Sequence, residues 1–272
     1  MIIILSDINY QNWDYNCEFW NSFMKNTVAL VVPCFNEQDR LSRDYFESIL
    51  VSPEITLMFV NDGSSDSTSD WIQDFCLNQP RAMFLNLKNN LGKAEAVRLG
   101  MLSCYEHGFS YIGFLDCDGA FASSDVVRLV NLIANQNLQI RRVLPISVLL
   151  SSRIKLSGRQ IERSEFRHII GRLVAAVIGI NWKNSPYDSQ SGFKIFLSTS
   201  ELYSAIQETF KTRWFLDVEL LLRLQSQGKQ AFWEEPVDSW SDVKGSKIRM
   251  INYFSILKEI IYIHKIVKSQ ST

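Results

Sequence analysis

The sequence predicts an α/β protein with a mostly parallel central sheet flanked by helices, and three observations lead to this prediction. The chain has 272 residues, of which 46% are hydrophobic and 21% are charged, so it can bury a large core. Four short apolar segments in its first half alternate with segments of helical character, which is typical of βαβ units. Polar residues follow each apolar segment, as expected where parallel strands end at a ligand site.

The predicted elements begin after residues 1–26, which we expect to form an N-terminal extension. The strands are expected at residues 27–33, 55–62, 82–87 and 111–118. The helices are expected to begin at about Asn36, within residues 65–75, at Gly92 and at about Ser123. Several side chains that can cap a helix stand at the start of the second helix, and Gly108 ends the third.

Composition limits the classes of function. The net charge of −1 provides no overall attraction to nucleic acid. Five cysteines without C-x-x-C spacing argue against a zinc site or a disulfide framework and for a reducing compartment. The longest apolar run, residues 173–180, is too short to span a bilayer, and the first residues make a poor signal peptide. We therefore expect a cytoplasmic protein without a membrane-spanning helix.

Asp116 and Asp118 end the fourth predicted strand, with Gly119 directly behind them. Side chains two apart in an extended strand face the same side, so the two carboxylates can act on one ligand. A solvated turn is the alternative without function. Two chemistries use such a pair: phosphatases of the haloacid dehalogenase type, and nucleotide-sugar transferases that hold a divalent metal. Three βα units precede the pair, and Ala120 stands where those phosphatases carry Thr, so a transferase is favoured.

A series of motifs in order resembles that of the family 2 glycosyltransferases of GT-A fold, and the resemblance covers roughly residues 27–250. In the first half the motifs are VVPCFNE, FVNDGSSDST, NLGKAEAVRLG and LDCD. In the second half SSR, FRHIIGRL, DSQSGFKIF, RWFLDVELL and W-x-x-x-x-G-S-K resemble the dolichyl-phosphate β-glucosyltransferase branch. The related mannosyltransferases usually carry D-A-D-L-Q, with Gln as a further metal ligand, whereas here Gly119 stands in place of the Leu and Ala120 in place of the Gln.

The resemblance implies an inverting transferase that moves glucose from UDP-glucose to a polyprenyl phosphate. Asp116 and Asp118 would hold Mg²⁺ or Mn²⁺, since hard oxygen ligands suit these ions. Three alternatives stay open: mannosyl transfer from GDP-mannose to the same lipid, transfer to a glycan or another soluble acceptor, and a nucleotide-sugar-binding scaffold without turnover.

Candidate contacts with the nucleotide sugar come from the ends of the predicted strands. Asp62 is expected to accept a hydrogen bond from a uracil N–H or a ribose hydroxyl, although it could instead cap the next helix. Gly92 and Lys93 open a helix, where backbone N–H groups and an ammonium suit an anion. The resemblance adds Pro33, Asn36, Glu37 and Cys117. Asn36 and Glu37 could equally cap the first helix, and Cys117 could be a small buried filler.

Candidate acceptor residues come from the second half of the chain. Arg153 and Arg167 match the family positions that meet the lipid phosphate, and their planar guanidinium groups suit that role. Arg159, Arg163 and Arg167 have the i, i+4, i+8 spacing of one helix face. The resemblance also suggests that Asp188 and Gln190 bind the sugar or the acceptor and that Lys247 closes over the diphosphate.

Asp217 lies where many family 2 enzymes keep an acidic catalytic residue. As a base it would deprotonate a sugar hydroxyl. A phosphate acceptor is already anionic and needs no strong base, so with such an acceptor Asp217 is expected to orient the acceptor or a basic side chain.

The C-terminal segment 249–272, which follows the expected transferase domain at 27–248, predicts an amphipathic helix. Its apolar residues recur at i, i+3, i+4 and i+7 spacing: Met250, Tyr253, Phe254, Leu257, Ile260 and Ile261. From Ser241 onward six basic residues stand against two acidic ones, a net charge of +4. The helix could lie in the headgroups at the cytoplasmic face of a membrane, or it could pack on the domain or on a partner subunit.

Overall fold

A computed structural model provides the structure of the chain. It describes residues 27–134, 146–162, 185–228, 230–243 and 253–270, together with residues 176, 177, 179 and 182. The predicted N-terminal extension, residues 1–26, lies outside the described residues.

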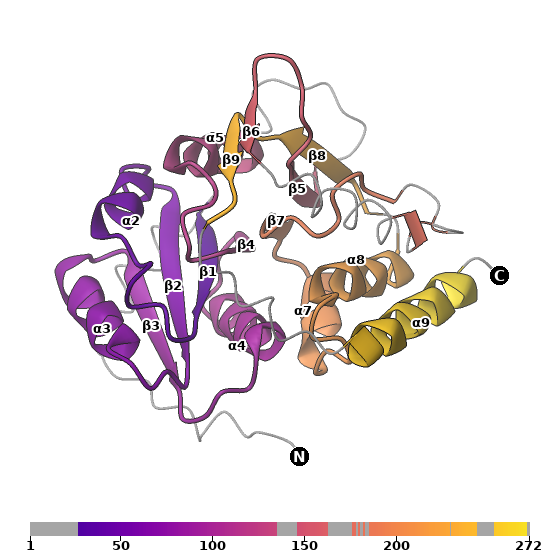
Figure 1. Cartoon of the computed structure of the whole chain (residues 1–272), viewed down its shortest axis with the longest axis horizontal. Helices are drawn as coiled ribbons and strands as arrows, with labels where there is room; N and C mark the ends of the chain where they lie inside the picture. Colours follow the sequence, from indigo (N-terminus) through magenta and orange to yellow (C-terminus); the bar gives the residue numbers. More distant parts are fainter. Residues whose placement is uncertain are drawn as a thin grey trace.

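In the described part of the chain, a seven-stranded sheet forms the centre of the molecule, in the order β3-β2-β1-β4-β7-β5-β8 (Figure 1). The strands are β1 (Val28–Cys34), β2 (Ile55–Asp62), β3 (Ala82–Leu87), β4 (Tyr111–Leu115), β5 (Val148–Ser152), β7 (Phe193–Leu197) and β8 (Phe232–Pro236). β1 to β4 run parallel to one another, and β7 lies antiparallel between β4 and β5. The predicted fold class is therefore confirmed.

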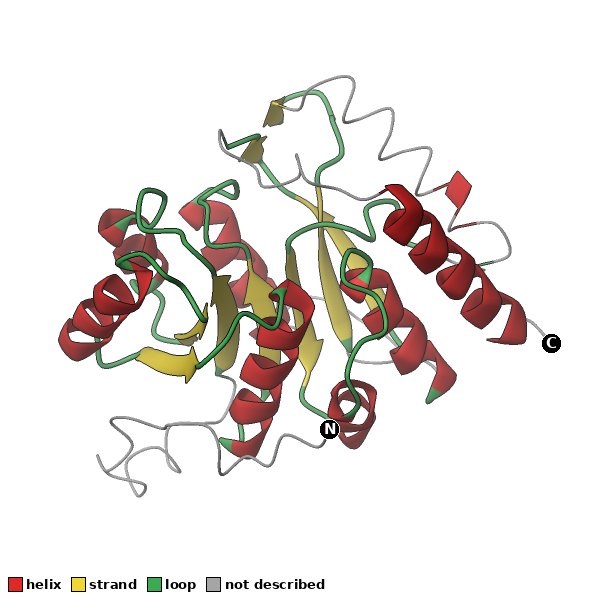
Figure 2. Ribbon diagram, turned by 60° about the horizontal axis from the view of Figure 1, so that its bottom comes forward, coloured by secondary structure: helices red, strands yellow, loops and turns green. Residues whose placement is uncertain are grey.

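Helices cover both faces of this sheet (Figure 2). The helices are α2 (Arg43–Ile49), α3 (Thr68–Asn78), α4 (Lys93–Glu106), α5 (Ser123–Ala134), α7 (Ser200–Gln207), α8 (Leu216–Ser226) and α9 (Tyr253–Gln270). Side chains of α4, α7, α8 and α9 share one apolar core, and those of α2, α3 and α5 share the other.

Alternating apolar side chains on the central strands form both cores. In β1, Ala29 and Val31 face the α4 side, whereas Val28, Leu30 and Val32 face the α2 side, and all five are buried. Burial on both faces explains why these strands appear in the sequence as continuous apolar runs.

The close contact of α4 with the sheet depends on a glycine in that helix. A Cβ atom at Gly100 would lie 2.5 Å from Cγ1 of Val31, so a larger residue would push the helix away. The N-terminus of α4 therefore lies close to the ends of β1 and β2.

The first helix begins later than the sequence indicates. Residues 36–42 form a turn in which Asn36 adopts a left-handed φ of 51°. Ser42 is the N-cap of α2, because its side chain accepts a hydrogen bond from the backbone N–H of Tyr45. Asn36 and Glu37 are therefore not the caps of this helix, which was one of their two predicted roles.

The predicted helix face through Arg159, Arg163 and Arg167 is wrong at its first member. Arg159 directly precedes β6 (Gln160–Glu162), which pairs in parallel with β9 (Ser239–Ser241). The side chain of Arg159 forms an ion pair with Asp238. The i, i+4 spacing is misleading here because strand pairing overrides it. Arg163 and Arg167 lie outside the described residues.

The predicted C-terminal helix is present as α9 and packs beside α8 (Figure 1). Ile263 and Val267 are buried in the core, and Ile260 packs against it. Glu259 accepts a hydrogen bond from the backbone N–H of Trp214 at 2.9 Å. Much of the predicted apolar stripe is therefore a packing surface of the domain.

The outer side of α9 keeps two apolar residues exposed, Leu257 at 55% and Ile261 at 49% of their surface. The side chains of Met250, Tyr253 and Phe254, which complete the predicted stripe, lie outside the described ones. Among the described helices, none combines the length and the apolar character that crossing a bilayer requires.

The packing of α9 can be tested with two isoleucines of the same helix. Ile263→Ala should lower the free energy of unfolding by about 2–4 kcal/mol, because it removes buried methyl groups and leaves a cavity. Ile261→Ala is the matched control and should change it by less than about 0.5 kcal/mol, since the side chain is half exposed. Urea denaturation measures both values. Equal effects would contradict the packing of α9 against α8.

Candidate functional site

The predicted polar clusters meet at the carboxyl-terminal edge of the sheet. Asp62 ends β2, Asp116 and Asp118 follow β4, and Asn36 and Glu37 follow β1. Because β1 pairs with both β2 and β4 in parallel, these residues share one edge.

Backbone-to-side-chain hydrogen bonds lock the loops after β1 and β2 together. The N–H of Asn36 donates to Oγ of Ser64 at 3.0 Å, and Oδ1 of Asn36 accepts from the N–H of Ser65 at 2.8 Å. The N–H of Glu37 donates to Oγ1 of Thr68 at 2.8 Å. Asn36 therefore joins the two loops, and its contact with a nucleotide sugar stays a prediction, as does that of half-buried Pro33.

Asp62 secures the loop that leads into α4. Its two carboxylate oxygens accept from the N–H groups of Leu91 (2.7 Å) and Gly92 (2.8 Å), and its side chain is buried. Burial raises the pKa of Asp62, although these two N–H groups oppose the shift. Asp62 does not cap α3, which begins at Thr68. Its predicted contact with uracil or ribose stays a prediction.

Lys93, the first residue of α4, reaches across to β4. Its Nζ lies 2.5 Å from Oδ1 of Asp116. Burial alone would lower the pKa of Lys93, but the carboxylates of Asp116 and Asp217 outweigh it and raise the pKa. The structure thus brings the predicted anion-binding lysine against one of the two predicted metal ligands.

A glycine of the DSQSGF motif fixes the place of Asp116. The N–H of Asp116 donates to the carbonyl of Gly192 at 3.0 Å. A Cβ atom at position 192 would collide with Oδ2 and Cγ of Asp116, so only glycine leaves room for the carboxylate.

Asp118 contacts the guanidinium of Arg40 and the backbone of the turn that follows β4. Its Oδ1 accepts from the N–H of Ala120 at 3.2 Å, and Oδ2 lies 3.8 Å from Nη1 of Arg40. Glu37 holds Arg40 through two hydrogen bonds of 2.5 Å. Burial and then the charge of Asp116 raise the pKa of Asp118. Glu37 therefore acts on the site indirectly, by holding the Arg40 side chain near Asp118.

These residues fit a divalent cation. Two neighbouring carboxylates, of which Asp116 raises the pKa of Asp118, are stabilised by a shared positive charge. The buried hydroxyl of Tyr45 has no hydrogen-bond partner in the described structure, and Asp118 and Asp116 are, after burial, the groups that most raise its pKa. In the described ranges, no three His, Cys, Asp or Glu side chains are placed so that they could hold a metal ion together. A bound Mg²⁺ or Mn²⁺ would therefore complete its shell with substrate oxygens and water, as Mg²⁺ usually does.

Cys117, between the two aspartates, is buried like Cys34 on the neighbouring strand. The contact with the Cys34 thiol and then burial raise the pKa of the Cys117 thiol, so it remains protonated near neutral pH. This environment agrees with the role of a small buried filler.

Arg153 and Asp188, both predicted to bind substrate, are each other's partners. Nε and Nη2 of Arg153 lie 2.7 Å from the two carboxylate oxygens of Asp188, and Nη2 also donates to the carbonyl of Gln190 at 3.1 Å. The guanidinium stacks over the ring of Trp240, 5.2 Å from its centre. Burial alone would raise the pKa of Asp188, but Arg153 lowers it.

Sequence reasoning missed the residue that holds this loop. Glu234 on β8 accepts hydrogen bonds from the N–H groups of Tyr187 (2.8 Å) and Asp188 (2.7 Å). Two adjacent glutamates in the short segment FWEEP were the available signal, but only the pairing of β8 with β5 brings Glu234 to the loop.

Asp217 lies in the first turn of α8 and pairs with a lysine that the sequence did not single out. Its Oδ1 lies 2.7 Å from Nζ of Lys194, a residue of β7 with no exposed surface. The expectation that Asp217 orients a basic side chain agrees with this geometry. The signal in the sequence was a single lysine inside the apolar strand FKIFL.

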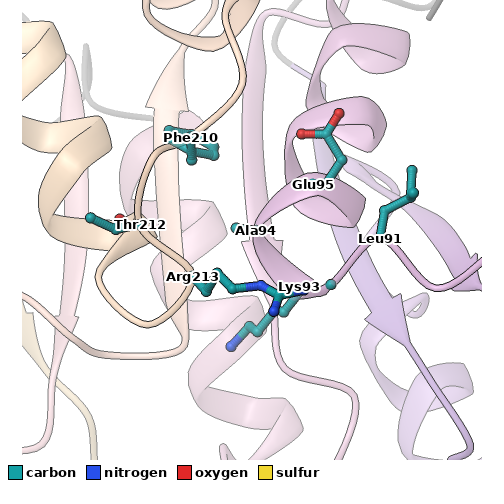
Figure 3. Close-up of a pocket in the computed structure, with 8 residues that line it drawn as sticks. Leu91, Lys93, Ala94, Glu95, Phe210, Thr212 and Arg213 are labelled. Carbon is teal, nitrogen blue, oxygen red and sulfur yellow. The ribbon is translucent and has the colours of Figure 1, made fainter. Parts of the chain in front are cut away.

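A pocket opens at the start of α4 (Figure 3). It is lined by Leu91, Gly92, Lys93, Ala94, Glu95, Phe210, Thr212 and Arg213. The side chain of Arg213 extends toward Lys93, and its guanidinium lies over Gly92. Glu219 holds the Arg213 loop by accepting from the N–H groups of Lys211 (3.1 Å) and Thr212 (2.8 Å). Arg213 is a second residue that sequence reasoning missed.

The structure thus brings Asp62, Gly92, Lys93, Asp116 and Asp118 to one edge of the sheet. Asp217 belongs to the same site, since its charge acts on Lys93. Arg167 and Lys247, predicted to meet the lipid phosphate and the diphosphate, lie outside the described residues.

The fit of Gly192 against Asp116 can be tested by metal binding. Gly192→Ala should weaken Mn²⁺ affinity about 10- to 100-fold, the usual effect of disturbing a residue that positions a ligand. Ser157→Ala is the control, because it changes an exposed side chain away from Asp116. Mn²⁺ titration followed by electron paramagnetic resonance measures both. Unchanged affinity in the Gly192 variant would show that Asp116 is not a metal ligand in its described position.

Comparison with known proteins gives matches in sequence. Residues 29–147 match the family model Glycosyl transferase family 2. The chain is 26% identical over 246 residues to a dolichyl-phosphate beta-glucosyltransferase of Trichomonas vaginalis, covering 87% of this chain and 70% of that protein. It is 27% identical over 252 residues to the dolichyl-phosphate beta-glucosyltransferase of Saccharomyces cerevisiae, covering 87% and 73%.

Solved structures share the fold at lower identity. Glucosyl-3-phosphoglycerate synthase of Mycobacterium tuberculosis, solved with UDP, superimposes with a TM-score of 0.59 at 15% identity, over 92% of this chain and 83% of that one. A structure of the same enzyme contains Mn²⁺, UDP-glucose and phosphoglyceric acid, with a TM-score of 0.58 at 15% identity over 95% and 86% of the chains.

The parallel sheet with its antiparallel β7, the aspartate pair after β4 and these sequence matches agree with one another. The chain therefore has the GT-A fold, matches the family 2 glycosyltransferase model over residues 29–147, and resembles the dolichyl-phosphate β-glucosyltransferases.

Proposed function

We propose that the protein is a metal-dependent, inverting glucosyltransferase that uses UDP-glucose and a polyprenyl phosphate. The names of its relatives in Trichomonas vaginalis and Saccharomyces cerevisiae support the sugar and the acceptor. UDP-glucose and Mn²⁺ bound to a protein of the same fold are consistent with the donor and the cofactor.

The observation that carries the proposal is the pairing of Asp116 and Asp118 with cations from two other loops. Lys93 comes from α4 and Arg40 from the loop after β1, and both lie within 4 Å of a carboxylate oxygen of the pair. Cations and metal-binding carboxylates at one edge suit a nucleoside diphosphate, whose oxygens need positive partners. A divalent metal bound by Asp116 and Asp118 would neutralise the charge that develops on the departing diphosphate.

The chain's own residues would bind and orient the donor. Asp62 holds the loop at the start of α4 and has further lone pairs for a uracil N–H or a ribose hydroxyl. Lys93 and Arg213 bring two positive charges to the pocket at this helix start, where a diphosphate would be attracted.

The acceptor would enter from the side of Arg153 and Asp217. A phosphate oxygen of the acceptor would attack C1 of the sugar opposite the leaving UDP, which inverts the configuration. Arg153, held by Asp188, and Arg167 are the proposed partners of the acceptor phosphate. Transfer to a soluble hydroxyl acceptor would instead require Asp217 to act as the base.

The decisive experiment offers labelled UDP-glucose, UDP-galactose, UDP-N-acetylglucosamine and GDP-mannose with polyprenyl phosphate, and measures label in the organic phase. We expect label from UDP-glucose only, and only with Mg²⁺ or Mn²⁺. Label from GDP-mannose would favour the mannosyl alternative. Label that stays in water-soluble products would overturn the lipid acceptor, and donor binding without any turnover would favour a scaffold.

The metal ligands can be tested by single substitutions. Asp116→Ala or Asp118→Ala should lower metal-dependent turnover by about 100-fold or more, because several kcal/mol of charge stabilisation would be lost. Asp70→Ala, an exposed aspartate of α3, is the control and should keep normal turnover. Steady-state rates in Mg²⁺ and Mn²⁺ measure the effect, and near-normal rates in either aspartate variant would refute the metal site.

A contact between α9 and the membrane surface is also proposed. Leu257 and Ile261 lie exposed on the outer side of α9, with the exposed lysines Lys258, Lys265 and Lys268 on the same helix. Apolar side chains beside basic ones suit the headgroup layer of an anionic bilayer.

The membrane contact can be tested without disturbing the core of α9. Leu257→Glu with Ile261→Glu should weaken binding to vesicles that contain anionic lipid by about 10-fold or more, through lost apolar burial and added negative charge. Val51→Glu with Leu77→Glu is the control, because it makes the same change at exposed sites elsewhere. Co-sedimentation measures binding, and equal binding of the two variants would place the membrane contact outside α9.

A further inference from the structure

Lys194 is a charged residue in the interior of the sheet, and the proposed function gives it no role in binding the donor or the acceptor. It has no exposed surface, and its Nζ lies 5.3 Å from the centre of the Phe114 ring. The ammonium donates to Oδ1 of Asp217 at 2.7 Å and to the backbone carbonyl of Ser191. Burial lowers the pKa of Lys194, and the charge of Asp217 opposes this shift.

The ion pair leaves one oxygen of Asp217 available. Oδ2 accepts no hydrogen bond from any described residue. The buried side-chain atoms without a partner in the described structure are the hydroxyls of Tyr45 and Ser103, so Oδ2 of Asp217 is accessible to solvent. Lys93 lies close enough for the charge of Asp217 to raise its pKa, and Lys93 contacts Asp116. The free oxygen therefore belongs to the same site as the aspartate pair.

A buried ion pair is a costly way to stabilise a fold. An apolar residue of similar volume, such as Met, would often serve the core equally well or better. Lys194 lies among apolar side chains of β4 and β7, and its side chain reaches the first turn of α8, where it meets Asp217. Its position is thus explained by what it does to Asp217 rather than by packing.

We propose that Lys194 is a positioning residue that holds one oxygen of Asp217 and so presents the other to the substrate. The presented oxygen accepts a hydrogen bond from a hydroxyl of the donor sugar. This inference rests on the proposed glycosyl transfer, but it does not depend on which acceptor takes the sugar.

A double-mutant cycle separates positioning from a merely structural role. The variants are Lys194→Met, Asp217→Asn and the double variant, with Lys155→Met, an exposed lysine, as the control for the substitution type. The readouts are turnover of UDP-glucose with polyprenyl phosphate, slow hydrolysis of UDP-glucose in water, and affinity for UDP by calorimetry.

Lys194→Met should lower kcat about 10- to 100-fold, since a small misplacement of an orienting group can have an effect of that size. UDP affinity should stay within about 2-fold, because UDP lacks the glucosyl group that Asp217 would bind. In the Asp217→Asn background, Lys194→Met should lower kcat by less than about 2-fold, since both changes remove the same interaction. Lys155→Met should match the unchanged protein.

Two results would overturn the inference. One is an equal loss of kcat from Lys194→Met in both backgrounds, and the other is a loss of UDP affinity that parallels the loss of kcat. If Lys194→Met alone does not fold, the double variant can still be studied, because it removes both buried charges. Its kcat is then compared with that of Asp217→Asn, and a difference of more than about 2-fold would overturn the inference. Hydrolysis without transfer to polyprenyl phosphate would refute the proposed acceptor, and the cycle measured on hydrolysis would still test Lys194.

Discussion

The contact between Gly192 and Asp116 is the constraint on which the rest of the site depends. β7 runs antiparallel between β4 and β5, so the loop that precedes it meets the end of β4. The missing side chain at Gly192 lets the Asp116 carboxylate sit at the edge of the sheet, where Lys93 can reach it. The same loop carries Asp188, so one short segment positions both the aspartate pair and the partner of Arg153.

Three ion pairs surround this contact: Lys93 with Asp116, Lys194 with Asp217, and Arg153 with Asp188. Within these three pairs the six formal charges cancel. Neutral pairs of this kind can exchange partners with an incoming phosphate or metal at little electrostatic penalty, because each charge stays compensated. The arrangement suits a reaction in which a dianionic leaving group forms between fixed cations.

The helix α9 packs on the domain with its inner side and keeps apolar residues exposed on its outer side, whereas the sequence suggested either packing or a surface role. Its inner side completes the core on α8, with Ile263 and Val267 buried and Glu259 bonded to the Trp214 backbone. Its outer side still exposes Leu257 and Ile261 beside lysines. Deleting α9 would therefore expose part of the core. A surface role of the helix can be tested only by substitutions of its exposed residues.

The sequence by itself determined the four parallel strands β1 to β4, because segments such as ITLMFVND are short, apolar on both faces and followed by polar turn residues. The strands of the second half, β5 to β9, were not predicted. It also determined which residues stand at the strand ends, since a parallel sheet collects them at one edge. Only the tertiary structure decided their partners: the pairing of Arg153 with Asp188, the buried Lys194 under Asp217, and the support from Glu234 and Arg213. These contacts join residues far apart in the chain, and no local periodicity encodes them. The helix face expected through Arg159 failed for the same reason, because pairing with β9 overrides local spacing.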